Sequence, residues 1–321
     1  MTISAEPPSA HTLQRFPDFY IVGHSKSGTT ALYEMLKRHP QIYMPELKEP
    51  TYFAADLRPR FQQSVPEPQT LADYLGLFAP AQASQRVGEA SSLYLFSHDA
   101  ASAIAASQPN ARIIAILREP ASFLRSLHLQ LLQIHNETEK SLRSAISLEQ
   151  ARARGAQIPP SCSRPQALRY SERVRYVEQL RRFHAVFAPE QVLILIYDDF
   201  RDDNETVVRQ VLRFLAVDDA QPLQVLQANP TVAVRSVRLH SLKHTLRTAD
   251  APAVRAVRAA GQALMTPRAR MLLRRAIFSE TPPPDEQLML ELRRRFAPEV
   301  LALSEYLGRD LVSLWGYDSL G

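Results

Sequence analysis

The chain alternates short apolar runs with longer amphipathic stretches, a pattern typical of a protein built from both strands and helices. Continuous apolar runs predict three buried strands, at 19–22, 111–117 and 192–197. Each run is followed by a stretch with apolar residues at helical spacing. Repeated alternation of this kind predicts the α/β class, with a parallel central sheet and helices on both of its faces.

Weaker patterns predict the remaining elements. Residues 54–69 and 136–168 lack a clear period, so irregular structure is expected there. The stretch 229–280 is helical in character and strongly basic. We expect helices at 29–36, 71–78, 98–107, 120–134, 172–187, 205–215 and 285–307, and short strands at 41–44 and from residue 86.

Length and composition favour one large domain. The chain has 321 residues, of which 45% are hydrophobic, enough for a sizeable core. We expect a flexible arm over 1–16 and a single domain over 17–321, with a helical part from about residue 229. The formal charge of +5 is compatible with anionic ligands, nucleic acid or a membrane surface and selects none of them.

Cysteine content and hydropathy indicate the cellular compartment that we expect for this protein. Cys162 is the only cysteine, which excludes an intrachain disulfide framework. No apolar run approaches the roughly 18 residues of a membrane-spanning helix, and the first residues lack the apolar core of a signal peptide. We therefore expect a cytoplasmic protein. Peripheral contact with a membrane stays open, and the oligomeric state is not indicated.

A polar loop from Gly23 to Gly28 joins the first strand to its helix. This geometry directs free backbone N–H groups and the positive end of the helix dipole at one spot, which suits a phosphate or another oxyanion. Lys26 adds a positive charge. The loop has the length of a Walker loop, but Thr29 stands where the Walker lysine would be. Hydroxyl donors are available from Ser25, Ser27, Thr29 and Thr30.

The sequence SKSGTT after an apolar strand resembles the 5′-phosphosulfate loop of sulfotransferases that use 3′-phosphoadenosine 5′-phosphosulfate (PAPS). This resemblance implies a P-loop-NTPase-like parallel sheet flanked by helices, followed here by a helical, basic C-terminal extension. It also implies that Lys26 contacts the bridging oxygen and the transferred sulfonate. The residues that would bind the 5′-phosphate are Ser27, Gly28, Thr29 and Thr30.

Arg118 and Ser126 form a second constellation. Arg118 follows the strand at 111–117, and Ser126 lies about two turns into the next helix. Ligands of open α/β sheets bind at the carboxyl ends of strands, so Lys26 and Arg118 are expected at the same edge. In the family that the loop resembles, an arginine and a serine at this spacing hold the 3′-phosphate. An arginine fork matches phosphate oxygens, and a serine hydroxyl adds a donor.

Two further segments resemble active-site segments of this family. LKEPTYF resembles the segment that supplies the catalytic base in the heparan-type Golgi enzymes, which implies that Glu49 is the base. RVGEASSLYL resembles the family's Glu-Lys-(Ser/Thr)-Pro-x-Tyr segment, but Ala90 replaces the lysine. Glu89 in this segment is the alternative base. With VLILIYDDF and YLGRDLVSLWG, the resemblance extends over roughly 17–317.

Other candidate residues have two interpretations. Arg235 and Arg238 are candidates for the segment that closes over the adenosine, or they belong to a solvated basic helix. His24 either touches the sulfonate or packs within the loop. Cys162 is interpreted as incidental, because no base lies near it in the sequence. No histidine spacing suggests a metal site, and none is expected.

Together these patterns predict a PAPS-dependent sulfotransferase. It would transfer a sulfonate in line to a hydroxyl, or to an amine, of a carbohydrate, a glycolipid or a small metabolite. One alternative is a P-loop-like kinase that uses ATP, which the position of Thr29 disfavours. The other is a non-enzymatic protein that binds nucleic acid or a membrane surface through the basic residues 235–275. Nucleic acid is not an expected partner of the sulfotransferase.

Overall fold

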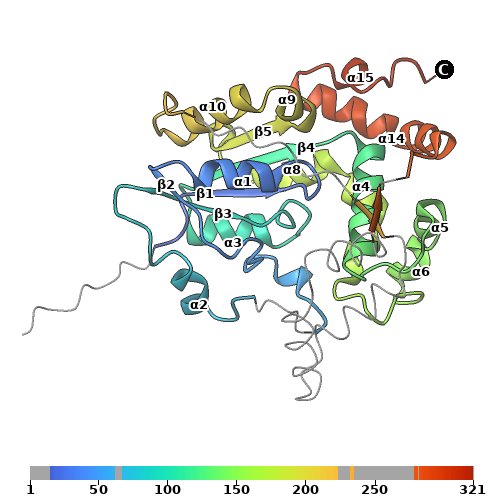
Figure 1. The fold of residues 1–321 in the computed structure, drawn as a ribbon, viewed down its shortest axis with the longest axis horizontal. Helices are drawn as coiled ribbons and strands as arrows, with labels where there is room; N and C mark the ends of the chain where they lie inside the picture. The colour runs from blue at the N-terminus through green and yellow to red at the C-terminus, as the bar shows by residue number, and fades with distance from the viewer. Residues whose placement is uncertain (1–14, 62–66, 223–231, 235–277, 281, 321) are drawn as a thin grey trace, which may run out of the picture.

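The computed structural model describes residues 15–61, 67–222, 232–234, 278–280 and 282–320. Its centre is a parallel sheet of five strands in the order β2-β3-β1-β4-β5 (Figure 1). This confirms the predicted α/β class. The strands are β1 (Phe19–Gly23), β2 (Ile42–Tyr43), β3 (Arg86–Ala90), β4 (Arg112–Leu117) and β5 (Val192–Ile196).

The middle strand, β1, is buried on both faces, which explains its continuous apolar sequence. Side chains along a strand alternate between the two faces. Tyr20 and Val22 enter one core cluster, and Phe19 and Ile21 enter the other. Because β1 pairs in parallel with both β3 and β4, the loops after these three strands emerge at one edge of the sheet.

Helices cover both faces of this sheet (Figure 1). One group packs on the face of Phe19 and Ile21, and the other packs on the face of Tyr20 and Val22. The first group is α1 (Thr29–Lys37) and α10 (Asn204–Leu215), and the second includes α3 (Ala100–Ser107), α4 (Pro120–Gln133) and α8 (Tyr176–His184).

The helix predicted at 285–307 is confirmed as α14, and Gly308 in a left-handed conformation ends it. This long helix and several shorter elements complete the described part of the chain. They are η1 (Ala55–Leu57), α2 (Leu71–Gly76), α5 (Leu142–Ser147), α6 (Glu149–Ala153), η2 (Pro165–Leu168), α7 (Tyr170–Arg173), η3 (Pro189–Gln191), α9 (Tyr197–Asp202), α14 (Glu286–Leu307) and α15 (Leu311–Leu314).

The stretch 172–187 forms two helices, so the prediction of one continuous helix was wrong. The side-chain amide of Gln179, on α8, donates hydrogen bonds to the backbone oxygens of Glu172 and Arg173, at 3.0 and 3.3 Å. These bonds satisfy carbonyl groups at the end of α7, where a continuous helix would have used its own N–H groups. The spacing of apolar residues cannot predict a cap that is made by a polar side chain.

Two other regions form helices that the sequence interpretation did not predict. The region 136–168 contains α5 and α6, and Ser141 caps α5 by accepting a hydrogen bond from the backbone N–H of Ser144. Tyr197, expected at the end of a strand, begins α9. Two aspartates in the first turn of α9 favour a helix there, because they face the positive end of its dipole.

The basic region 229–280 is described only in two short segments. β6 (Val232–Val234) and β7 (Phe278–Glu280) pair in antiparallel fashion, and β6 lies beside α4 (Figure 1). These strands depart from the helical expectation, and the β-branched valines of β6 favour a strand. The helical character of the C-terminal part is confirmed by α14 and α15.

Several predicted features lie outside the described residues. They include Arg235, Arg238 and residues 1–14 of the predicted arm, so these predictions stay predictions. In the part of the chain that the structure describes, no helix combines the length and the apolar character needed to cross a bilayer.

Candidate active site

The polar loop after β1 lies at the carboxyl edge of the sheet and leads into α1. Its backbone turns at Lys26 and Gly28, which have φ values of 64° and 91°. A Cβ atom on Gly28 would lie 2.8 Å from the ring of Phe200, so a side chain there would both collide and strain the backbone. Gly28 caps α1 without a side-chain hydrogen bond. The first N–H groups of the helix are therefore available to an anion.

Buried hydroxyl groups lie on this loop and on α4. Ser27 is fully buried and Ser126 is 4% exposed, and neither hydroxyl has a hydrogen-bond partner among the described residues. Buried polar groups are nearly always hydrogen-bonded in folded proteins, so both hydroxyls are suited to a ligand oxygen. Thr29 is buried in the first turn of α1, whereas Thr30 is exposed.

Arg118 follows β4, the strand beside β1, and reaches the loop. Its Nη1 donates a hydrogen bond of 2.9 Å to the backbone oxygen of Lys26. Its guanidinium carbon lies 4.7 Å from the centre of the Tyr197 ring, a cation–π arrangement. Burial, and secondly the charge of Arg118, lower the pKa of Lys26. The structure thus brings Lys26 and Arg118 together, and an anion bound there would relieve their repulsion.

Glu49 lies in the loop after β2 and is held beside the end of β3. Its backbone N–H donates to the oxygen of Ala90 at 3.0 Å. Its carboxylate accepts hydrogen bonds from the backbone N–H and the hydroxyl of Ser92, at 2.7 and 2.9 Å, and Lys48 Nζ lies 2.6 Å away. Glu49 has a φ of 63°, which a non-glycine residue keeps only when its surroundings fix it. The carboxylate is therefore held in one position.

A cavity of about 270 Å³ connects the loop to Glu49. Ser25, which precedes Lys26 in the loop, lines this cavity together with Glu49. Leu127 and Leu131 from α4 contribute an apolar wall. A molecule bound in this cavity would contact the loop and the carboxylate at the same time.

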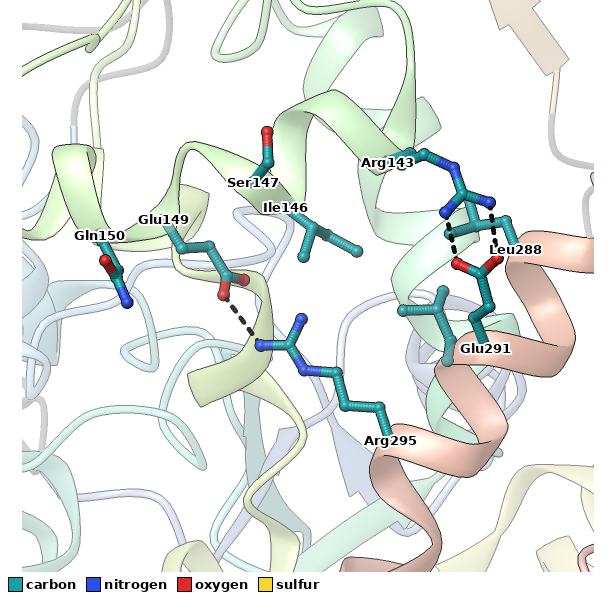
Figure 2. Close-up of a pocket in the computed structure, with 9 residues that line it drawn as sticks. Arg143, Ile146, Ser147, Glu149, Gln150, Leu288, Glu291 and Arg295 are labelled. Carbon is teal, nitrogen blue, oxygen red and sulfur yellow. Dashed lines mark hydrogen bonds and ion pairs between the residues drawn. The ribbon is translucent and has the colours of Figure 1, made fainter.

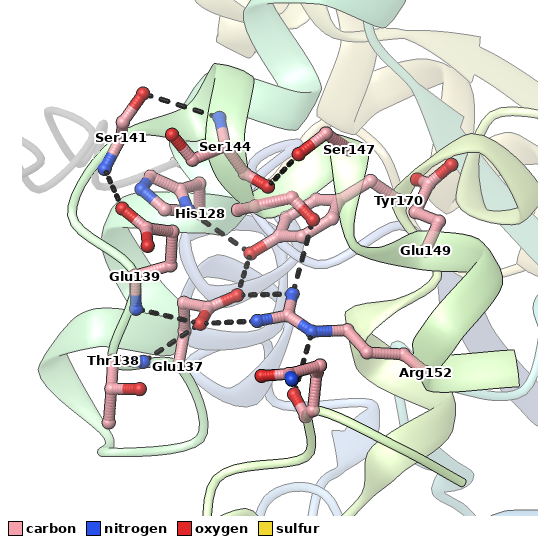
Figure 3. Close-up of polar contacts among 12 residues, drawn as sticks. His128, Glu137, Thr138, Glu139, Ser141, Ser144, Ser147, Glu149, Arg152 and Tyr170 are labelled. Atoms are coloured by element: carbon pink, nitrogen blue, oxygen red, sulfur yellow. Dashed lines mark hydrogen bonds and ion pairs between the residues drawn. The ribbon is translucent and has the colours of Figure 1, made fainter. Parts of the chain in front are cut away.

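A buried ion pair lies next to one wall of the cavity. Arg152 donates to both carboxylate oxygens of Glu137, at 2.7 and 2.8 Å, and the Tyr170 hydroxyl adds a bond of 3.0 Å (Figure 3). The neighbouring residue, Asn136, lines the cavity. Its Oδ1 accepts a hydrogen bond of 2.9 Å from the backbone N–H of Ser163. The ion pair therefore fixes the segment that carries Asn136.

Glu89, the alternative base, has a different environment. It is fully buried in β3, and its Oε2 accepts hydrogen bonds from the hydroxyls of Tyr74 and Tyr94, at 2.8 and 2.9 Å. Burial raises the pKa of Glu89 to about 7. It does not line the cavity. Glu89 thus belongs to the core, whereas Glu49 faces the cavity.

Burial determines the chemistry of His24, which the sequence left open, and of Cys162, which the sequence indicated was incidental. His24 is fully buried, and its Nε2 lies 2.6 Å from Oε1 of Gln179. Burial, followed by the nearby charge of Arg173, lowers the pKa of His24 to about 3, so the ring is neutral and packs within the loop. Burial raises the pKa of the Cys162 thiol to about 11, which makes it a poor nucleophile at neutral pH.

A second cavity, of about 370 Å³, lies between α5, α6 and α14 (Figure 2). Arg143 pairs with both carboxylate oxygens of Glu291, and Arg295 lies 3.6 Å from the carboxylate of Glu149. None of the residues that line it belongs to the loop after β1. With both arginines paired, this cavity is a contact between helices rather than a candidate site.

Sequence reasoning did not select three residues that shape the site. Tyr197 and Phe200 lie against Gly28, and Tyr197 also stacks on Arg118. Their position at the end of the predicted strand at 192–197, or shortly after it, was an available signal, because the carboxyl ends of parallel strands form the ligand-binding side of the sheet. Arg173 lines the cavity, but its sequence context is that of a polar position on an amphipathic helix. No sequence signal marked it.

Comparisons with known proteins agree with this geometry. The sequence matches the family model described as "Sulfotransferase family" over residues 17–221. It is 27% identical to carbohydrate sulfotransferase 15 of Homo sapiens, in a match that covers 63% of this chain and 44% of that protein. It is 29% identical to the bifunctional heparan sulfate N-deacetylase/N-sulfotransferase 4 of Mus musculus, over 64% of this chain and 23% of that protein. The chain thus matches less than half the length of these curated relatives.

A solved structure extends the similarity. The fold resembles the crystal structure of a sulfotransferase from Alicyclobacillus acidocaldarius, with a TM-score of 0.65 and 25% sequence identity. The match covers 93% of this chain and 98% of that one. The family model covers more than half of the chain, and the five strands of the central sheet, the loop after β1 and Arg118 all fall within the matched residues. The chain therefore belongs to the sulfotransferase family.

Proposed function

We propose that this sulfotransferase moves a sulfonate group from PAPS to a hydroxyl group of a carbohydrate acceptor. The observation that carries the proposal is the cavity that Ser25 and Glu49 line together. It joins the loop that contains Lys26, where a donor nucleotide would lie, to a fixed carboxylate that can take a proton.

The residues at the carboxyl ends of β1 and β4 fit a donor with two separated phosphate groups. The uncapped N-terminus of α1, with Ser27, Gly28, Thr29 and Thr30, would bind the 5′-phosphate. Arg118 and Ser126 would bind the 3′-phosphate. The unpartnered hydroxyls of Ser27 and Ser126 support this assignment, since each would gain a partner from one of the two phosphates.

Lys26 would stabilise the negative charge that develops on the phosphate oxygen when its bond to sulfur breaks. PAPS supplies the activated sulfonate. The ammonium group and the N-terminus of α1 provide positive potential that is already oriented before the reaction. Arg118 holds the backbone oxygen of Lys26 and so helps to keep the loop in place. Much of the rate enhancement would come from such positioning and electrostatics.

Glu49 would act as the general base. The acceptor oxygen forms a bond to sulfur, the bond from sulfur to the phosphate oxygen breaks, and the acceptor proton passes to a carboxylate oxygen of Glu49. Its contacts with Lys48 and Ser92 hold the carboxylate in place for this transfer. Glu89 lacks access to the cavity and is assigned a structural role.

The relatives support a carbohydrate as acceptor. One is named a carbohydrate sulfotransferase, and another acts on heparan sulfate by its name and transfers to nitrogen. An apolar wall of Leu127 and Leu131 opposite polar side chains suits a sugar ring, which has both apolar and polar faces. Glycolipids and small metabolites present the same hydroxyl chemistry, and an amine is the remaining acceptor type.

A labelled-sulfonate transfer screen over these acceptor classes tests the proposal. Calorimetry with 3′-phosphoadenosine 5′-phosphate (PAP) and with ATP tests the donor, and we expect much tighter binding of PAP. Lys26→Ala should abolish transfer, whereas Lys37→Ala, which removes the same charge from a pair with Glu46, should not. Equal affinity for PAP and ATP, or no transfer from PAPS to any acceptor class, would contradict the proposal.

A further inference from the structure

Arg173, the last residue of α7, is a buried cation without a matching anion. The residue is 1% exposed and lines the cavity that contains Glu49. Its Nε and Nη1 have no hydrogen-bond partner among the described residues, and its Nη2 lies 3.5 Å from the hydroxyl of Ser25. Burying a charge without a partner is costly, so a side chain kept in this state points to a ligand.

The other charged groups of the cavity are paired. Lys48 lies 2.6 Å from Glu49, and Arg164 forms an ion pair with Glu67. Among the described residues, no carboxylate lies within 4.0 Å of the Arg173 guanidinium. The lining of the cavity therefore carries one positive charge more than it carries negative charges, and that charge is on Arg173.

A neighbouring aromatic ring does not replace the missing anion. The guanidinium carbon of Arg173 lies 4.4 Å from the centre of the Phe96 ring. Such stacking covers one face of the guanidinium and offsets part of the cost of burial. The N–H groups point along the plane of the guanidinium, so they remain available to an acceptor oxygen.

Arg173 lies between the loop after β1 and the proposed base. Its Nη2 is near the Ser25 hydroxyl of that loop, and its charge acts on His24 and is acted on by Glu49. Arg173 and Glu49 also line the same cavity.

We propose that Arg173 binds an anionic group of the acceptor, a carboxylate or a sulfate ester, in the cavity where the acceptor hydroxyl reacts. The inference rests on the proposed function and narrows its acceptor to an anionic saccharide. The free N–H groups of Arg173 would donate to the anionic oxygens, and Ser25 would add a hydroxyl donor. Leu127 and Leu131 would contact the apolar part of the molecule.

A matched pair of saccharides tests this. 4-Nitrophenyl β-glucuronide and 4-nitrophenyl β-glucoside differ in a carboxylate, and their affinities are measured by calorimetry on full-length protein saturated with PAP. We expect the wild type to bind the glucuronide on the order of tenfold more tightly, as for a hydrogen bond to a charged group. Arg173→Gln should lose this preference, and Arg173→Lys should retain part of it. Arg169→Gln, in a half-buried pair with Glu172 that does not line the cavity, should retain it fully.

Thermal unfolding and donor affinity provide independent readouts. Because Arg173 is buried without an anion, Arg173→Gln should unfold at or above the wild-type temperature in the absence of ligand. PAP and PAPS affinities should be unchanged. A lower unfolding temperature with the glucuronide preference intact would assign Arg173 a structural role and overturn the inference.

The remaining outcomes separate the inference from the proposed function. If the wild type binds PAP but shows no preference for the glucuronide, including no measurable binding of either saccharide, the inference is wrong and the donor assignment stands. If Arg173→Gln weakens PAPS but not PAP, the arginine serves the transferred sulfonate and the inference is also wrong. If the wild type does not bind PAP, the proposed function itself fails.

Discussion

Nη1 of Arg118 donates a hydrogen bond to the backbone oxygen of Lys26, at 2.9 Å. The bond ties the end of β4 to the loop that follows β1. The Tyr197 ring lies against the guanidinium, and the Tyr176 hydroxyl donates to the backbone oxygen of Arg118 at 2.8 Å. Arg118 is thus held on several sides, which orients its remaining N–H groups before any ligand binds.

Replacement of Arg118 by alanine should weaken PAP binding by about 1.5–3 kcal/mol, the value of a hydrogen bond to a charged group. Calorimetry with PAP measures the loss, and the same titration with adenosine 5′-phosphate tests whether the 3′-phosphate is responsible. Arg201→Ala, in exposed pairs with Asp198 and Asp202, is the control and should bind both ligands normally. A similar loss for the ligand without a 3′-phosphate would show that Arg118 is misassigned.

Transfer activity should persist in EDTA. A sulfonate carries less negative charge than a phosphoryl group, and Lys26 with the N-terminus of α1 supplies positive potential at the loop. Within the described ranges, no group of three or more His, Cys, Asp or Glu side chains is arranged to hold a metal ion. The measurement compares initial rates with and without EDTA. Complete loss of transfer under chelation, restored by Mg²⁺, would contradict this expectation.

Lys26 and Arg118 could be identified from the sequence because each lies next to a strongly predicted strand. Lys26 follows a buried strand and precedes a helix, and Arg118 follows another buried strand, so strand order alone brings both to one edge. Their contact needs no information from distant parts of the chain beyond the pairing of β1 with β4. The same reasoning explains why the central strands were predicted well, since buried parallel strands have continuous apolar sequences.

The features that the sequence did not reveal depend on contacts between distant segments. Arg173 is buried because Phe96 and the loop at Ser25 pack around it, and neither is near it in sequence. Gln179 ends α7 through its side chain, which apolar periodicity does not report. The family resemblance placed Glu49 before Glu89, but only the structure shows their different surroundings, a cavity for Glu49 and tyrosines for Glu89. Polar side chains carry no pattern that distinguishes burial from exposure.

The buried pair of Glu137 and Arg152 should contribute strongly to stability. Both side chains are at most 1% exposed, so removal of one partner leaves an uncompensated buried charge. Arg152→Met should lower the free energy of unfolding by about 3–5 kcal/mol, as for other broken buried pairs. The double variant with Glu137→Gln should lose less, and urea unfolding measures both. A double variant as unstable as Arg152→Met would contradict this account.

The same pair predicts a dependence of stability on pH. Burial opposes ionisation of Glu137, but the hydrogen bonds and charge of Arg152, together with hydrogen bonds from the backbone N–H groups of Glu139 and Thr138, outweigh it and lower the pKa of Glu137. The pair therefore stabilises the protein above the unfolded-state pKa of about 4.3, and this contribution is lost as pH falls below it. Glu137→Gln should show a weaker decrease in unfolding free energy under acid. Parallel pH curves for wild type and variant would rule out this contribution.

The final prediction concerns the proton from the acceptor. Glu49→Gln preserves size and can still contact Ser92, but it cannot take a proton, so turnover should fall by about 10²–10⁴, typical for loss of a general base. PAP affinity should barely change, because Glu49 lines the cavity proposed for the acceptor, and Arg118 does not line it. Glu89→Gln is the matched control: its side chain is fully buried and hydrogen-bonded to Tyr74, so turnover should be retained if the variant folds. Circular dichroism checks folding of both. Near-normal turnover of Glu49→Gln, together with loss in a folded Glu89→Gln, would make Glu89 the base and leave Glu49 to shape the cavity.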